Sequence, residues 1–203
     1  MVKNQLDGIS DRIAYCITRS LRFLADTFFS KRYGHRAVVL ETVAAVPGMV
    51  SGMWIHLKSL RETKTGYGPK IRTLLGEAEN ERMHLMTFID IAQPTKLERS
   101  LILFAQFLFW HFYFVLFVFA PRTAHRMIGY FEEEAVISYT QYLEQVDAHP
   151  ELNIAAPKIA IDYWKLPADA RLRDVIIAVR ADEQGHSEVN HAYADEFDLK
   201  TSK

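Results

Sequence analysis

The sequence holds very little cysteine and no excess of charge of either sign. Cys16 is the single cysteine among 203 residues, so an internal disulfide is excluded and a reducing compartment is favoured. With 24 Lys and Arg against 25 Asp and Glu, the chain lacks the basic excess typical of nucleic-acid-binding proteins. Residues 1–12 lack the apolar core of a secretory signal and the acid-poor composition of a transit peptide. We therefore expect a bacterial protein that works where it is made and binds no nucleic acid.

Strand signals are also scarce, and the sequence divides into long periodic segments separated by turn formers. Residues 1–203 are most simply one domain, large enough to bury a substantial core. Apolar periodicity and the positions of proline and glycine predict six helices. They cover residues 10–31, 36–62, 70–93, 101–120, 122–147 and 168–195. The predicted fold class is all-α.

Residues 10–31 have the composition of a helix that lies along a membrane surface. Apolar side chains such as Ile13 and Leu21 recur at helical spacing, with basic side chains such as Arg12 and Arg19 beside them. A basic face opposite an apolar face is typical of interfacial amphipathic helices. The alternative is an ordinary surface helix packed on a bundle.

Residues 101–120 form an apolar run about as long as a bilayer-spanning helix. Gln106 and His111 interrupt the run, no second span is expected to return the chain, and the candidate chemistry lies on both sides of it. We therefore expect a helix that is buried in a bundle or lies against it at the lipid interface. A transmembrane span is the alternative.

One pattern, Glu-x-x-His, occurs in two of the predicted helices. Its copies are Glu81 with His84 and Glu183 with His186. Residues three apart lie on one face of a helix, so the carboxylate and the imidazole can bind the same metal ion. A duplicated Glu-x-x-His, with one inward Glu on each of two other helices, is the ligand pattern of di-iron four-helix bundles.

Two further glutamates fit the remaining ligand positions. Glu41 lies in an otherwise apolar segment, where a buried carboxylate needs a partner such as a metal ion, and a surface Glu is the alternative. Residues 132–134 are three consecutive glutamates that point about 100° apart on a helix, so at most two face inward. Glu132 is the best candidate because Ala135 and Tyr139 follow on its face.

The ligand set predicts the metal and the architecture. Four carboxylates and two neutral imidazoles balance two divalent cations, which suits a site with apolar walls. Mixed oxygen and imidazole ligation is typical of iron or manganese sites that react with dioxygen, whereas structural zinc favours closed thiolate sets. We expect two iron ions because iron has the redox states that oxygen chemistry requires, with manganese as the alternative. A ferritin-like four-helix bundle follows, flanked by helices 10–31 and 101–120.

Polar neighbours of the ligands have expected roles as well. Asp182 and Asn80 each precede a ligand glutamate and can orient a ligand histidine on a neighbouring helix. Tyr139 lies where a redox-active phenol would be useful, with a packed core tyrosine as the alternative. Tyr163 and Trp164 can extend a buried hydrogen-bond or electron path, although packing is the commoner role of such aromatics.

Four segments resemble the signature segments of the alternative oxidases, the cyanide-insensitive ubiquinol oxidases of mitochondria and some bacteria. They are LETVAAVPGM, NERMHL, FEEEAVISYT and RADEQGHSEVNH. The resemblance extends through SLRFLADTFF, PRTAHRMIGY and DYWKLP and covers nearly everything after about residue 10. It implies two iron ions bound by Glu41, Glu81, His84, Glu132, Glu183 and His186.

The resemblance also implies the surroundings of the metal centre. Tyr139 becomes the essential tyrosine, within a polar network of Asn80, His125, Asp182, Tyr163 and Trp164. The quinol pocket that it suggests is formed by Arg22, Asp26, Arg36, Leu40, Glu134, Ala135 and Ser138. The family often has Thr where this chain has Ser138, which keeps the hydroxyl. The regulatory cysteine of plant members is absent, which puts organic-acid activation through a thiol in doubt.

The function that the resemblance implies is oxidation of ubiquinol and reduction of dioxygen to water without proton pumping. It further implies a monotopic homodimer on one leaflet, on the cytoplasmic face of a bacterial inner membrane, or on the matrix side of the mitochondrial inner membrane in a eukaryote. A quinone-ring hydroxylase and a plastid-type quinol oxidase are alternatives on the same scaffold. Iron storage and a non-catalytic, membrane-interacting helical protein are further alternatives; the apolar residues 101–120 argue against the first, and the duplicated Glu-x-x-His against the second.

Overall fold

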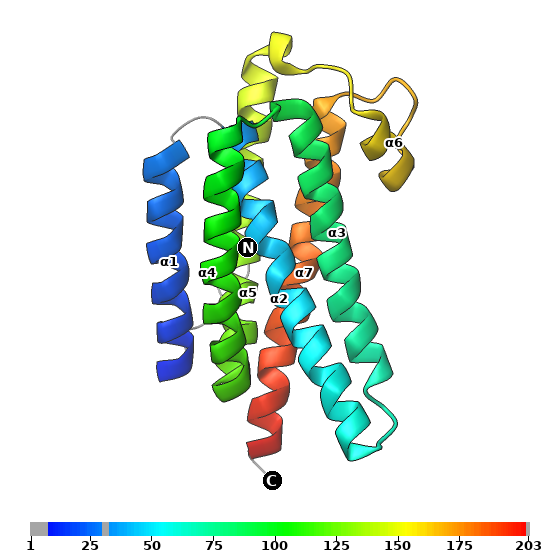
Figure 1. Cartoon of the computed structure of the whole chain (residues 1–203). Coiled ribbons are helices and arrows are strands. Elements are labelled where there is room, and N and C mark those ends of the chain that lie inside the picture. The colour runs from blue at the N-terminus through cyan, green and yellow to red at the C-terminus, as the bar shows by residue number, and fades with distance from the viewer. Residues whose placement is uncertain (1–7, 30–32, 202–203) are drawn as a thin grey trace.

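The computed structural model describes residues 8–29 and 33–201, and the regular elements in these residues are helices. They are α1 (Ile9–Phe29), α2 (Tyr33–Glu62), α3 (Gly68–Ala92), α4 (Lys96–Phe119), α5 (Pro121–Ala148), α6 (Lys158–Trp164) and α7 (Leu172–Thr201) (Figure 1). One 3-10 turn, Pro150–Leu152, follows α5. The predicted all-α fold is confirmed. The short α6 lies in a proline-containing stretch between the predicted helices 122–147 and 168–195.

The helix ends follow from local sequence. Proline lies in the first turn of both α3 and α5, where its missing N–H removes no helical hydrogen bond. Thr95 and Glu98 form a capping box at the start of α4, in which each side chain accepts from the other residue's backbone N–H. Gln93 ends α3 in the left-handed conformation, with φ of 48°.

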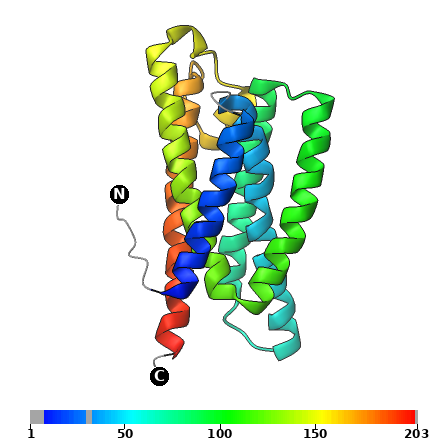
Figure 2. The ribbon, with the colours of Figure 1, turned by 90° about the vertical axis from the view of Figure 1, so that its left-hand side faces the viewer.

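Four long helices form the bundle, in which α2 packs against α3 and α5 packs against α7. The helices α1 and α4 lie on one flank, where α1 packs on α5 and α4 packs on α2 and α5 (Figures 1 and 2). The architecture is therefore a four-helix bundle with two flanking helices, as predicted.

Two glycines allow the paired helices to approach closely. At Gly48 of α2, a β-carbon would collide with the backbone oxygen of Leu74 on α3 and would lie 3.0 Å from the backbone nitrogen of Ala78. At Gly129 of α5, a β-carbon would lie 2.5 Å from the His191 ring on α7. A side chain at Gly48 would force α2 and α3 apart, whereas one at Gly129 would displace the His191 ring.

The apolar core is divided into two clusters by the turns that carry the candidate ligands. Along α2, Val38 belongs to one cluster and Val46 to the other, with Glu41 between them in sequence. Along α5, Met127 and Val146 belong to opposite clusters, on either side of Glu132. Apolar packing on both sides therefore limits the access of water to these turns.

Among the described residues, two helices are long and apolar enough to cross a membrane, Gly34–Glu62 and Lys96–Phe119. The expectation that no second segment of this kind exists is therefore wrong. The apolar window of α2 is 61% buried inside the protein, whereas that of α4 is only 11% buried. Burial of α4 within the bundle, one of its two expected placements, is wrong as well.

The flank of the bundle that carries α1 and α4 exposes large apolar side chains. On α4 they are Leu97, Leu101, Leu103, Phe104, Phe107, Leu108, Phe112, Val115 and Phe119, and on α1 they include Ile9, Ile13, Phe23 and Leu24. An exposed apolar surface of this extent marks a site of contact with lipid or protein.

Candidate metal centre and adjoining pocket

The structure brings all six predicted ligands together from the four bundle helices. Their ligand atoms form two groups, each with atoms within 4.8 Å of one another. The first group is Glu41, Glu81, His84 and Glu183, and the second is Glu81, Glu132, Glu183 and His186. Glu81 and Glu183 occur in both groups, so the two groups share these carboxylates.

The polar atoms of this cluster are buried without enough hydrogen-bond partners. Both side-chain oxygens of Glu81 and one of Glu183 have none within the described residues. The Nδ1 atom of His186 lies 2.7 Å from Glu81 Oε1 but makes no hydrogen bond to any part of the chain that the structure describes. Because unpaired buried polar atoms are costly, their convergence fits a site that cations complete.

His84 contacts three carboxylates through one ring nitrogen. Its Nδ1 lies 3.3 Å from Glu41 Oε2, 3.3 Å from Glu81 Oε2 and 3.4 Å from Glu183 Oε1. The ring itself is fully buried. A nitrogen that faces three carboxylates in this way is suited to bind the same cation as they do.

The carboxylates repel one another in the absence of a cation. Burial, followed by the charges of Glu183 and Glu81, raises the pKa of Glu41 well above its ordinary value. The same causes, in the same order, raise the pKa of Glu132. The metal-free site therefore favours protons on these two carboxyls, and a metal ion would have to displace them.

The two histidines favour the charged form in the metal-free protein, whereas an isolated buried imidazole favours the neutral form. Burial lowers the pKa of His186, but Glu183 and Glu81 outweigh it and raise that pKa to about 11. The pKa of His84 is also raised well above its ordinary value, since Glu81 and its hydrogen-bond partners outweigh burial. Metal binding at this site must therefore also release protons from the imidazoles.

Asp182 accepts three hydrogen bonds behind His84. Its Oδ2 lies 3.2 Å from His84 Nε2, 3.0 Å from Asn80 Nδ2 and 2.8 Å from Trp164 Nε1. Asn80 also donates to the Tyr163 hydroxyl at 3.0 Å. With Nε2 of His84 held by Asp182, Nδ1 faces the carboxylates, and it would offer its lone pair to a metal ion once its proton is released.

His125 lies apart from these four residues. Its Nδ1 is 3.0 Å from Asn190 Oδ1, and its ring contacts the rings of Phe117 and Tyr193. Within the described part of the chain no hydrogen bond joins it to Asp182. The structure therefore brings together Asn80, Asp182, Tyr163 and Trp164, but places His125 in a separate group.

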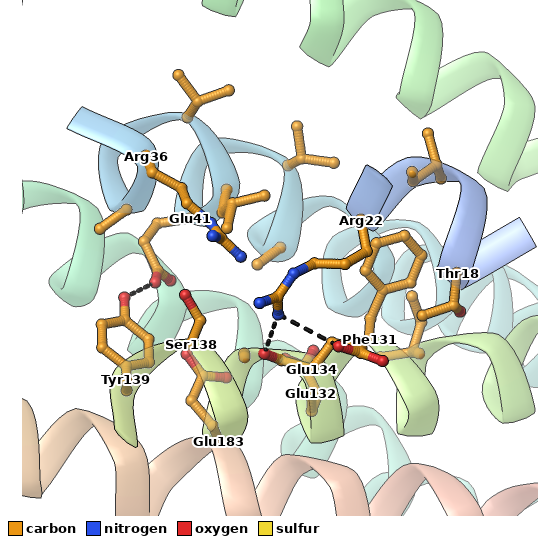
Figure 3. Close-up of a pocket in the computed structure, with 18 of the residues that line it drawn as sticks. Thr18, Arg22, Arg36, Glu41, Phe131, Glu132, Glu134, Ser138, Tyr139 and Glu183 are labelled. Carbon is orange, nitrogen blue, oxygen red and sulfur yellow. Dashed lines mark hydrogen bonds and ion pairs between the residues drawn. The ribbon is translucent and has the colours of Figure 1, made fainter. Parts of the chain in front are cut away.

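Tyr139 contacts the candidate ligands directly. Its hydroxyl donates a hydrogen bond to Glu41 Oε1 (Figure 3), and its ring stacks on Phe88 at a centroid distance of 5.6 Å. Burial, then the charges of Glu41 and Glu183, raises the pKa of the phenol. Tyr139 is therefore a protonated donor held at the edge of the cluster.

A cavity of about 210 Å³ lies between α1, α2, α4 and α5 and ends at the cluster (Figure 3). Glu41, Glu132, Glu183 and Tyr139 form its inner end. Six of the seven predicted pocket residues line it: Arg22, Arg36, Leu40, Glu134, Ala135 and Ser138. The remaining residue, Asp26, lies between Arg22 and Arg36.

Charged side chains hold two arginines in this cavity. Arg22 donates to the Glu134 backbone oxygen at 2.8 Å and to its carboxylate at 3.2 Å. Asp26 lies 2.9 Å from Arg22 Nε and 2.5 Å from Arg36 Nη1. Asp26 therefore positions both guanidinium groups without lining the cavity itself.

A model of the family described as alternative oxidase matches residues 1–195. The chain belongs to the alternative oxidase family. It is 57% identical over 188 residues to the mitochondrial ubiquinol oxidase of Batrachochytrium dendrobatidis, which covers 93% of this chain and 59% of the relative. It is 56% identical over 185 residues to the mitochondrial ubiquinol oxidase 1a of Arabidopsis thaliana, which covers 91% of this chain and 52% of the relative.

This alternative oxidase chain thus spans little more than half the length of these curated relatives. Both are named mitochondrial, so they lend no support to the bacterial origin that the sequence suggested.

Several residues that line the cavity of this alternative oxidase chain were not predicted from the sequence. Phe109 and Ala105 come from α4, Phe131 from α5, and Ala37 and Pro47 from α2. Small residues at apolar helix positions, such as the two alanines, are a signal of space between helices. Phe109 gave no such signal, because it lies in a helix that is apolar on all sides.

Proposed function

We propose that this chain is a ubiquinol oxidase that reduces dioxygen to water at a pair of iron ions. The observation that carries the proposal is a shared wall: Glu41, Glu132 and Glu183 belong both to the ligand cluster and to the lining of the apolar cavity. A quinol head group in the cavity would lie against the ligands. Two quinols then give four electrons and four protons to one dioxygen, which yields two quinones and two waters.

The residues present fit two divalent cations, with the four carboxylates and two imidazoles as ligands. The unpaired buried oxygens of Glu81 and Glu183 and the convergent Nδ1 atoms of His84 and His186 support this assignment. Two iron ions held here would supply the redox states that transfer electrons from quinol to dioxygen.

The chain's own residues bind and orient the substrate. Arg22 and Arg36 place N–H donors near the quinol oxygens, and the Ser138 hydroxyl can donate to or accept from the ring substituents. Leu40 and Ala135 supply apolar walls for the ring. These groups fix the head group and exclude water from the space between it and the cluster.

Tyr139 and Asp182 each act on a different ligand. Tyr139 holds a proton in its hydrogen bond to Glu41 at the inner end of the cavity. Asp182 fixes the ring of His84 with its Nδ1 facing the carboxylates that would share the metal. Asn80, Trp164 and, through Asn80, Tyr163 hold Asp182 in place.

The proposal includes attachment to one membrane leaflet through α1 and α4, whose exposed apolar side chains flank the cavity. A lipid-soluble quinol could then reach the cavity from the bilayer. Both relatives are named mitochondrial, which favours the mitochondrial location of the two that the resemblance implies. Pairing into a homodimer rests on the family resemblance, and the exposed Met49, Met53 and Leu57 of α2 offer an apolar surface for it.

Replacing Glu183 with alanine tests the proposal, because Glu183 belongs to both ligand groups and to the cavity. We expect the purified, iron-loaded protein to consume oxygen when quinol is added, and Glu183→Ala to abolish this uptake. Glu188→Ala, an exposed position on the same helix, is the control and should keep the activity. Uptake at the wild-type rate by Glu183→Ala would refute the assignment, and a hydroxylated quinone product would indicate a ring hydroxylase.

A further inference from the structure

A second set of buried polar side chains leads away from the ligand cluster, and neither the cavity lining nor the Asp182 network includes it. Asn190 lies at its centre, one turn after His186 on α7. Its Nδ2 donates to the His186 backbone oxygen at 3.0 Å and to Glu77 Oε2 at 3.1 Å. Its Oδ1 lies 3.0 Å from His125 Nδ1. Asn190 thus joins the ligand turn of α7 to residues on α3 and α5.

Glu77 is the ionisable end of this set. It lies one turn before Glu81 on α3, and its Oε1 is buried without a hydrogen-bond partner within the described residues. Burial raises the pKa of Glu77 to about 7, partly opposed by His186. The ionisable groups that interact with it are Glu81 on α3, His186 and Tyr193 on α7, and Tyr113 on α4. A carboxyl in this setting can lose and regain a proton near neutral pH.

His125 fixes the direction of the hydrogen bonds. It is fully buried, and burial lowers the pKa of its imidazole to about 3, so the ring is neutral. Because Asn190 Nδ2 donates to Glu77, Asn190 Oδ1 must accept, and His125 Nδ1 is the donor. His125 therefore holds the Asn190 amide in the orientation that binds one oxygen of Glu77 and leaves the other free.

The outer end of this set reaches the surface between α3 and α7. The centroids of the His125 and Tyr193 rings lie 5.3 Å apart, and Lys70 Nζ lies 3.7 Å from the centre of the Tyr193 ring. Lys70 in turn pairs with the half-exposed Glu196 at 3.3 Å. Lys70 and Glu196 lie on α3 and α7, whereas the cavity is lined by residues of α1, α2, α4, α5 and α7.

We infer that Glu77 carries protons between solvent and the metal centre, with Asn190 and His125 as its positioning residues. The inference rests on the proposed function, in which one dioxygen takes up four protons and two quinols release four. Glu77 delivers protons for water formation from the α3–α7 side and is reloaded from solvent. The protons of the quinols leave at the cavity. Uptake and release are equal, so the overall reaction stays balanced.

The substitution Glu77→Gln tests this role, because glutamine keeps the shape and can still accept from Asn190 but carries no exchangeable acid proton. We expect kcat to fall about tenfold or more with KM for quinol unchanged. The solvent deuterium isotope effect on kcat should increase. Glu77→Asp, which keeps an acid, should recover part of the rate. Glu79→Gln is the matched control, since Glu79 is an exposed residue two positions further along α3 that pairs with Arg82.

Infrared spectroscopy provides a readout that does not depend on turnover. In the metal-loaded wild-type protein we expect a protonated-carboxyl C=O band that disappears as pH is raised. Glu77→Gln should lack the band and Glu79→Gln should keep it. The band's persistence in Glu77→Gln, or a wild-type kcat in that variant, would overturn the inference.

Two further outcomes separate this inference from the proposed function. If Glu77→Gln fails to retain iron, Glu77 helps to hold the metal, and the proton-carrying role is overturned. If the iron-loaded wild-type chain does not oxidise quinol, the proposed function fails and the proton route for that reaction fails with it. If quinol oxidation depends on Glu183 but not on Glu77, only the proton route fails.

Discussion

Replacing Asp182 with alanine removes the acceptor of three hydrogen bonds behind His84. The donors are His84 Nε2, Asn80 Nδ2 and Trp164 Nε1, at 3.2, 3.0 and 2.8 Å from one oxygen. Without this acceptor the His84 ring loses both its fixed orientation and the neighbouring negative charge. Such partners of metal-binding histidines typically change metal affinity about 10- to 100-fold, or about 1.4–2.7 kcal/mol.

The stability of the metal-free protein should fall as well. Hydrogen bonds to a charged group contribute about 1.5–3 kcal/mol each, but the Asp182 side chain is 29% exposed, so water can replace part of the loss. We expect a decrease of about 2–3 kcal/mol in the free energy of unfolding. Asp182→Asn keeps an oxygen acceptor without the charge and should lie between alanine and the wild type.

The pH dependence of this contribution has a defined sign. Burial acts to raise the pKa of Asp182, but the hydrogen bonds from His84, Trp164 and Asn80 outweigh it and lower that pKa. The stabilisation is therefore complete above the ordinary pKa of 3.8 and is lost as pH falls through the lower pKa of the folded protein. The stability difference between the wild type and Asp182→Ala should shrink below that pH.

Competition between the protein and a ferrous chelator under anaerobic conditions measures the affinity. Asp162→Ala is the control, because Asp162 is exposed and, among the described residues, its carboxylate pairs with Lys158 alone. Iron affinity of Asp182→Ala equal to that of the wild type would show that the His84–Asp182 contact does not support metal binding.

Three other changes have defined outcomes. Since Glu41 and Glu132 have raised pKa values in the metal-free protein, iron loading should release protons and tighten as pH rises; loading a weakly buffered sample without acidification would contradict this. Gly48→Ala should destabilise the protein by more than about 2 kcal/mol in denaturant unfolding, because a β-carbon meets the backbone of α3. Gly76→Ala meets no atom and should be stabilising by up to about 1 kcal/mol, so similar effects of the two changes would refute the close approach. Phe104→Ser should weaken co-sedimentation with lipid vesicles about tenfold, since a large apolar side chain contributes about 1.5–3 kcal/mol when buried; unchanged binding would argue against lipid contact at α4.

The ligand cluster could be predicted from sequence because helical spacing alone places Glu and His on one face. The three consecutive glutamates illustrate both the strength and the limit of this reasoning. Glu132 points into the cluster, Glu133 pairs with His191, and Glu134 pairs with Arg22. Neighbouring apolar residues identified the inward glutamate, but the partners of the other two lie on helices distant in sequence.

Other features had no local signal. The sequence could not decide between the two expected placements of α4, because a helix that is apolar on all sides has no periodicity to indicate which side faces the bundle. The separation of His125 from Asp182 depends on contacts with Asn190, which only the packing of α5 on α7 determines. The sequence gives no signal that Glu77 is buried, because it lies among other glutamates on a helix with both buried and exposed faces.

The order of the six ligands along the chain has a consequence for biosynthesis. Glu41, Glu81 and His84 precede α4, and the other three ligands follow it. A growing chain must therefore expose α4, its most apolar helix, before the second half of the ligand set has been synthesised. During that interval the nascent protein is at risk of aggregation, so a chaperone or an early encounter with a lipid surface would determine how much of it matures.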